Sequence, residues 1–178
     1  LGALELQNDL TTISDLPTDV VAVEETAAYL DLSAVSLGDV DGNAGFALTL
    51  TADTGTMTAT AGGLVTVTGS STGALVLTGL AADIDAFLNT ASAIQYTGKP
   101  DVFGADRIAL SANDGSGVEQ LGSVNVNVTN VNDLTTISDL RTDVISVDED
   151  TAFDLDLSAV NLGDVDGNTG FELTLTAD

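Results

Sequence analysis

Hydrophobic and polar residues alternate along short stretches of this chain, and glycine, asparagine, aspartate or threonine separates most of these stretches. The clearest case is residues 46–51, where Phe46, Leu48 and Leu50 alternate with alanine and threonine. Successive side chains of a β-strand point to opposite faces, so this pattern predicts a strand with one buried face. Similar patterns predict further strands at residues 20–24, 29–33, 56–60, 64–68, 74–78, 94–96, 107–112, 118–128 and 171–176.

One segment follows a different period. Leu80, Ile84, Phe87 and Leu88 recur at the spacing of one helical face, which predicts a short helix over residues 80–88. Many short strands, glycine-rich turns and a single short helix are typical of an all-β fold. The sequence therefore predicts an antiparallel, immunoglobulin-like β-sandwich with one short helix crossing its end.

The chain also repeats itself. Residues 9–16 return unchanged as residues 133–140, and residues 31–43 return with one substitution as residues 156–168. The repeat is about 124 residues long, with Asp148 as a one-residue insertion, and this length indicates a repeated domain rather than a solenoid. We expect residues 1–8 to be the end strand of a preceding module, residues 9–132 to form a complete module, and residues 133–178 to be the first strands of a truncated second copy. Such a chain is most simply interpreted as a window on a longer tandem array.

The charge is strongly one-sided, with 28 Asp and Glu against three Lys and Arg, for a formal net charge of −25. This charge disfavours binding to nucleic acid and docking on anionic lipid. Repulsion among the acidic side chains also opposes a compact fold unless salt or bound cations screen the charge. Two interpretations remain open: adaptation to salty surroundings, or specific divalent-cation sites. The chain has no Cys and no apolar run long enough to insert in a membrane, and no signal peptide is visible in it.

The acidic residues gather in turns. Asp39-Val-Asp41-Gly-Asn43 repeats as Asp164-Val-Asp166-Gly-Asn168. In an extended loop, alternate side chains point the same way, so this spacing brings three oxygen ligands toward one point. A donor set of oxygens without His or Cys favours Ca²⁺ over other metals. The alternative is a polar turn held by its own side-chain hydrogen bonds.

Four motifs carry a resemblance to a known family. They are residues 23–26 with their copy 147–151, the two Asp-Val-Asp-Gly-Asn loops, residues 111–117, and residues 128–133 at the junction between copies. In order and spacing they resemble the cadherin-like modules found in tandem in large bacterial surface proteins. The resemblance implies a cadherin-like sandwich with calcium bound between consecutive modules.

The resemblance also implies the calcium ligands. At the junction they would be Glu24, Asp101, Asn130, Asn132, Asp133, Asp164 and Asp166. At the other end of the complete module they would be Asn8, Asp9, Asp39, Asp41 and Asp114. Both sites are expected to be incomplete within these residues.

Other functions find less support. There is no His or Cys for catalysis, and no Trp and only two Tyr to hold a sugar in a glycosidase site, so we expect no enzyme activity. Threonine rows at residues 56–60 and 66–68 are compatible with a sugar- or ice-binding face, although threonine is also the common outward residue of exposed sheets. Residues 1–8 and the incomplete second copy could instead complement each other between molecules, which would make the chain a filament subunit.

We therefore expect a non-catalytic, extracellular or cell-surface repeat of an adhesin or matrix fibre, with calcium stiffening its inter-domain junctions. The expected partners are neighbouring modules of the same chain or identical chains, with no nucleic acid and no membrane insertion.

Overall fold

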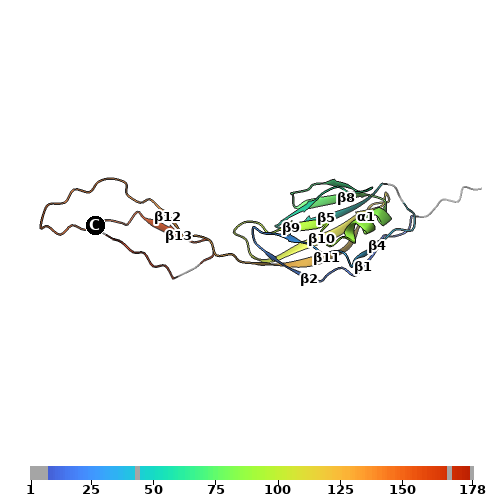
Figure 1. The fold of residues 1–178 in the computed structure, drawn as a ribbon, viewed down its shortest axis with the longest axis horizontal. Coiled ribbons are helices and arrows are strands. Elements are labelled where there is room, and N and C mark those ends of the chain that lie inside the picture. The colour runs from blue at the N-terminus through green and yellow to red at the C-terminus, as the bar shows by residue number, and fades with distance from the viewer. Residues whose placement is uncertain (1–7, 43–44, 168–169, 177–178) are drawn as a thin grey trace, which may run out of the picture. The chain divides into compact units, whose positions relative to one another are not determined.

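A computed structural model of the chain describes residues 8–42, 45–167 and 170–176. The chain divides into two compact units, Leu1–Asn130 and Val131–Asp178 (Figure 1). The strand predicted at residues 1–8 lies outside the described residues except for Asn8. Among the described residues, no helix has the length and apolar character needed to cross a membrane.

Two larger sheets and one two-stranded sheet form the first unit. The six-stranded sheet has the order β2-β11-β10-β5-β8-β7, and the three-stranded sheet has the order β3-β9-β6. The larger sheet contains β2 (Asp19–Val23), β5 (Phe46–Ala52), β7 (Thr66–Thr68), β8 (Ala74–Gly79), β10 (Gly104–Asn113) and β11 (Val118–Thr129). The smaller sheet contains β3 (Ala27–Tyr29), β6 (Thr56–Ala59) and β9 (Ile94–Thr97). β1 (Thr12–Ser14) pairs with β4 (Ser36–Gly38). This is an all-β, sandwich-like fold.

The inward-facing residues of these strands build one core. Phe46, Leu48 and Leu50 are each fully buried, as their alternation predicts. Other strands of the six-stranded sheet add Leu75, Leu77, Ile108, Leu110, Val124 and Val126 to this core. The three-stranded sheet adds Met57, Ile94 and Tyr96. Each such large apolar side chain contributes roughly 1.5–3 kcal/mol when it is removed from water.

The predicted helix is present as α1 (Ala81–Leu88). Its buried residues are Ala81, Ile84 and Leu88, and the helix packs mainly against β4 and β8. Leu80 was predicted to lie on the buried face, and this is wrong. Leu80 has an extended backbone conformation at the start of the helix and is 39% exposed.

One strand pair departs from the antiparallel arrangement that the sequence predicts. β2 pairs with β11 in parallel, with Val23 opposite Thr129, whereas the other paired strands in the described residues are antiparallel. A parallel pair needs a long connection, which the intervening strands of the unit supply. Because both strands run in the same direction, the C-terminal ends of β2 and β11 lie side by side at one end of the sheet.

In its described residues, the second unit reproduces only the two-stranded β1–β4 sheet of the first unit. β12 (Thr136–Ser138) pairs with β13 (Asn161–Gly163), and Ile137 lies opposite Leu162 as Ile13 lies opposite Leu37. The strand predicted at residues 171–176 is absent from the structure. Its counterpart β5 pairs with β8 and β10, and residues 131–178 contain no equivalents of those strands.

Candidate metal centre

One end of the first unit gathers chain segments that are far apart in sequence. β1 and β4 pair antiparallel with Thr12 opposite Gly38, so the residues before β1 lie beside the residues after β4. The first segment carries Asn8 and Asp9, and the second carries Asp39 and Asp41. Asp114 follows directly on β10, in the turn that leads to β11.

Short hydrogen bonds join these residues. The backbone N–H of Asp9 donates to Asp41 Oδ2 at 2.5 Å, and Asn8 Nδ2 donates to Asp114 Oδ2 at 2.5 Å. Within the loop, Asp39 Oδ1 accepts the N–H groups of Asp41 and Gly42 at 2.9 and 3.1 Å. The structure thus brings together all five residues that the sequence predicts for this end. Asn43, the third oxygen donor of the Asp-x-Asp-x-Asn pattern, lies outside the described residues.

Asp114 is ionised at neutral pH, although it is only 8% exposed. The hydroxyl and the backbone N–H of Ser116 both donate to its Oδ1, at 2.7 and 2.8 Å. These two bonds, together with the contact from Asn8, hold the pKa of Asp114 below its ordinary value because they favour the charged carboxylate. The site therefore presents a negative charge in a nearly buried position.

Asp39 provides an observation that points to a cation. Its Oδ2 is buried and has no hydrogen-bond partner among the described residues. The buried hydroxyl of Thr11, on the same segment as Asp9, has none among them either. Buried polar oxygens are almost always paired, and leaving one unpaired costs about 1–3 kcal/mol. A bound metal ion would satisfy Asp39 Oδ2, and the surrounding donor set of carboxylate and amide oxygens fits a hard cation such as Ca²⁺.

Glu119 is a member of this region that sequence analysis missed. It lies at the start of β11, and its Oε2 accepts the backbone N–H of Thr11 at 3.2 Å. This contact fastens the segment that carries Asn8 and Asp9 to the β10–β11 hairpin. The clue in the sequence was its position five residues after Asp114, across a glycine-containing turn.

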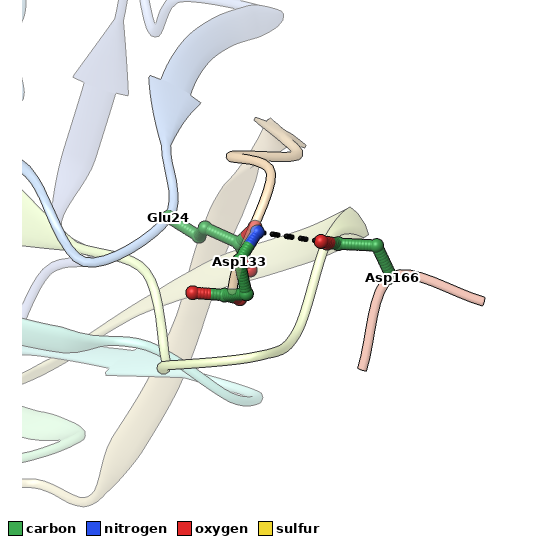
Figure 2. A group of neighbouring side chains, drawn as sticks. All are labelled: Glu24, Asp133 and Asp166. Atoms are coloured by element: carbon green, nitrogen blue, oxygen red, sulfur yellow. Dashed lines mark hydrogen bonds between the residues drawn. The ribbon is translucent and has the colours of Figure 1, made fainter. Parts of the chain in front are cut away.

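The second unit repeats the loop geometry of the first. The backbone N–H of Asp133 donates to Asp166 Oδ2 at 2.6 Å, as Figure 2 shows. The N–H of Asp166 donates to Asp164 Oδ1 at 3.0 Å. These three aspartates correspond to Asp9, Asp41 and Asp39, and they make the same two contacts. Asn132 precedes them and donates from Nδ2 to the carbonyl of Asp133 at 3.0 Å.

The remaining predicted ligands belong to the other end of the first unit. Glu24 directly follows β2 and Asn130 directly follows β11, so the two residues lie at the same end of the sheet. The backbone N–H of Glu24 donates to the carbonyl oxygen of Thr129 at 3.1 Å. Glu24, labelled in Figure 2, is only 1% exposed, and its backbone pairs with that of Gly98 in an isolated parallel β-bridge. Asp101 lies in the loop after β9, where it is exposed and has a φ of 58°.

No protein-family model matches this chain, and comparison with curated proteins finds no match either. The functional interpretation therefore rests on the internal repeat and on the geometry of these acidic residues.

Proposed function

We propose that this chain is part of a non-catalytic array of cadherin-like modules in an extracellular adhesin or matrix fibre. Calcium binds at the ends of the modules and stiffens the junctions between them. The observation that carries the proposal is the hydrogen-bonded grouping of Asn8, Asp9, Asp39, Asp41 and Asp114 at one end of the first unit. The buried oxygen of Asp39, with no hydrogen-bond partner in the described residues, lies in this set.

The donor chemistry supports calcium rather than a transition metal. Every proposed ligand offers a carboxylate or amide oxygen, and the chain contains no Cys and no His. Ca²⁺ accepts six to eight oxygen ligands in flexible geometry, and extracellular modules bind it at roughly 10⁻⁴–10⁻³ M. Bound Ca²⁺ would also neutralise part of the −25 charge, which otherwise opposes compaction.

The junction site follows from the repeat. Asp133, Asp164 and Asp166 have the same internal contacts as Asp9, Asp39 and Asp41, so the second copy carries the same half of a calcium site. The other half would come from the preceding module. We assign it to Glu24 and Asn130, which follow adjacent strands, and to Asp101 in the loop after β9.

Thermal unfolding of the 1–178 chain tests the proposal. At a calcium concentration about 100-fold above Kd, one site that binds only the folded state adds about 2.7 kcal/mol to the free energy of unfolding. We expect the first unit to melt at a higher temperature in millimolar calcium than in chelator at equal ionic strength. The variant Asp39→Asn/Asp41→Asn keeps the size of the side chains and should lose the part of this increase that comes from the end carrying Asn8 and Asp9.

A matched control separates ligation from general charge. Asp53→Asn/Asp143→Asn removes the same number of carboxylates at exposed positions outside the proposed ligand set. This variant should keep the full calcium-dependent increase. Equal melting temperatures in calcium and in chelator for the unmodified chain would show that the acidity serves solubility alone.

A further inference from the structure

An open groove of about 380 Å³ lies on the first unit, between the smaller sheet and the segment that includes α1 and the turn after it. It is distinct from the acidic ends, because none of its lining residues is a proposed calcium ligand. The lining consists of aromatic, hydroxyl, amide and methyl groups: Tyr29, Thr58, Ala59, Thr60, Phe87, Thr90, Ser92, Ala93 and Gln95.

The register of the smaller sheet arranges its most distinctive members in one row. Tyr29 of β3 lies opposite Gln95 of β9, and Gln95 lies opposite Thr58 of β6. Their neighbours Met57, Ile94 and Tyr96 are buried, so this row lies on the outer face of the sheet. Directly opposed residues have Cβ atoms about 4.5–5.5 Å apart, which places an aromatic ring, an amide and a hydroxyl within reach of one small ligand.

The groove is uncharged, whereas the chain as a whole is highly acidic. Of 178 residues, 28 are Asp or Glu, yet none of the lining residues is charged. We propose that this groove binds a neutral sugar residue, as part of an oligosaccharide or polysaccharide. This proposal does not depend on calcium binding.

The chemistry of the lining selects this ligand class. Tyr29 is 58% exposed and lines the groove, so its ring can offer an apolar face on which the C–H face of a pyranose stacks. Gln95 supplies both a hydrogen-bond donor and an acceptor, and Thr58 supplies a hydroxyl that can do either. Neutral sugars need this combination of a flat apolar contact and a few placed polar groups.

Other ligand classes fit less well. A chain with a net charge of −25 repels anionic ligands, and the groove has no Lys or Arg to offset that repulsion. A cation would bind to the carboxylates elsewhere on the chain, because the groove has no carboxylate in its lining. An extended apolar ligand would leave the amide of Gln95 without a hydrogen-bonding partner.

The aromatic residue of the groove is not kept in the second copy. The residue equivalent to Tyr29 in the second copy is Asp154, which would place a negative charge where the aromatic ring lies. Sugar binding would therefore differ between modules that otherwise share their strand pattern and acidic loops.

Titration of the ¹⁵N-labelled 1–178 chain in chelator, followed by NMR, tests the proposal. The probes are cellohexaose, maltohexaose and mannohexaose, with tetragalacturonate as an anionic comparison. We expect at least one neutral oligosaccharide to shift the signals of Gln95, Thr58 and the residues beside Tyr29 at millimolar concentration, and tetragalacturonate to shift none of them.

Two variants make the result specific. Tyr29→Ala should weaken binding by about tenfold, because it removes the stacking surface. Phe103→Ala removes an aromatic ring that is 50% exposed outside the groove and should leave binding unchanged. Both are surface changes, and unaltered melting curves will verify that the fold is intact. The proposal is overturned if no neutral oligosaccharide shifts these signals, if tetragalacturonate shifts them equally, or if Tyr29→Ala binds as well as Phe103→Ala.

Discussion

At the scale of single residues, Asp106 is a buried acid whose carboxylate accepts several hydrogen bonds. Its Oδ2 accepts the hydroxyl of Tyr96 at 2.5 Å and the N–H of Gly55 at 2.9 Å, while its Oδ1 accepts the N–H of Thr54. Burial alone favours the protonated form, but these bonds outweigh it and hold the pKa of Asp106 below its ordinary value. Burial and the bond to Asp106 raise the pKa of Tyr96. The pair therefore clamps the turn between β5 and β6 onto β10.

The first prediction concerns this clamp. Asp106→Asn should lower the free energy of unfolding at pH 7 by about 1–3 kcal/mol, because an amide cannot replace all the charge-assisted bonds. A folded-state pKa below the unfolded value means that the stabilisation is present above about pH 4 and is lost as the pH falls through the folded pKa. Urea denaturation at several pH values measures both effects.

The control for this clamp is Asp53→Asn. Asp53 forms an exposed ion pair with Arg107 at 3.6 Å, and such pairs contribute about 0–1 kcal/mol. A loss for Asp106→Asn no larger than that of Asp53→Asn, or a loss that does not shrink in acid, would contradict the proposed role of Asp106.

At the scale of elements, local patterns predict the longer strands of the first unit, but they do not predict the pairing between distant strands. They also miss the three-residue strands β1 and β4, and the strand predicted at residues 29–33 is wrong beyond Tyr29, where β3 ends. The alternation at Phe46–Ala52 and the helical period ending at Leu88 were sufficient to locate β5 and α1. Nothing local could show that β2 pairs in parallel with β11, because that pairing joins residues about 106 positions apart. For the same reason the spacing of Asp39 and Asp41 was visible in the sequence, whereas the contacts of Glu119 and Asp106 were not.

Residues 171–176 show how far a strand depends on its partners. Phe171, Leu173 and Leu175 are 43%, 49% and 58% exposed, whereas their equivalents Phe46, Leu48 and Leu50 are fully buried. The same alternation therefore forms a strand only where β8 and β10 pair with it.

Completing the second copy should restore this strand. Asp178 is equivalent to Asp53, so appending a duplicate of residues 54–130 after Asp178 supplies the missing partners. We expect the amides of residues 171–176 to become strongly protected in hydrogen exchange. As a control, the appended segment carries Asp in place of the residues equivalent to Ile108 and Leu110, which disrupts its buried face. Equally fast exchange at 171–176 in both proteins would contradict the interpretation of residues 133–178 as a truncated module.

At the scale of the whole molecule, the proposed role is mechanical spacing. A large negative charge favours repulsion between neighbouring modules. In the proposed account, calcium bound between the modules would replace this repulsion with shared ligation. Each module would contribute one half of a site at each end: Glu24 and Asn130 at one, and the Asp9, Asp39 and Asp41 group at the other. Stiffness of the array would then depend on calcium concentration.

Small-angle X-ray scattering of a chain with two complete modules, titrated with calcium at constant ionic strength, tests this claim most directly. The account predicts that the radius of gyration and the maximum dimension change to those of a stiff, extended pair of modules as calcium is added. Asp164→Asn/Asp166→Asn should abolish the change while both modules stay folded, because the proposal assigns these loop carboxylates to calcium binding and neither side chain is part of the hydrophobic core. Scattering curves that are identical with calcium and with chelator would contradict calcium-stiffened junctions.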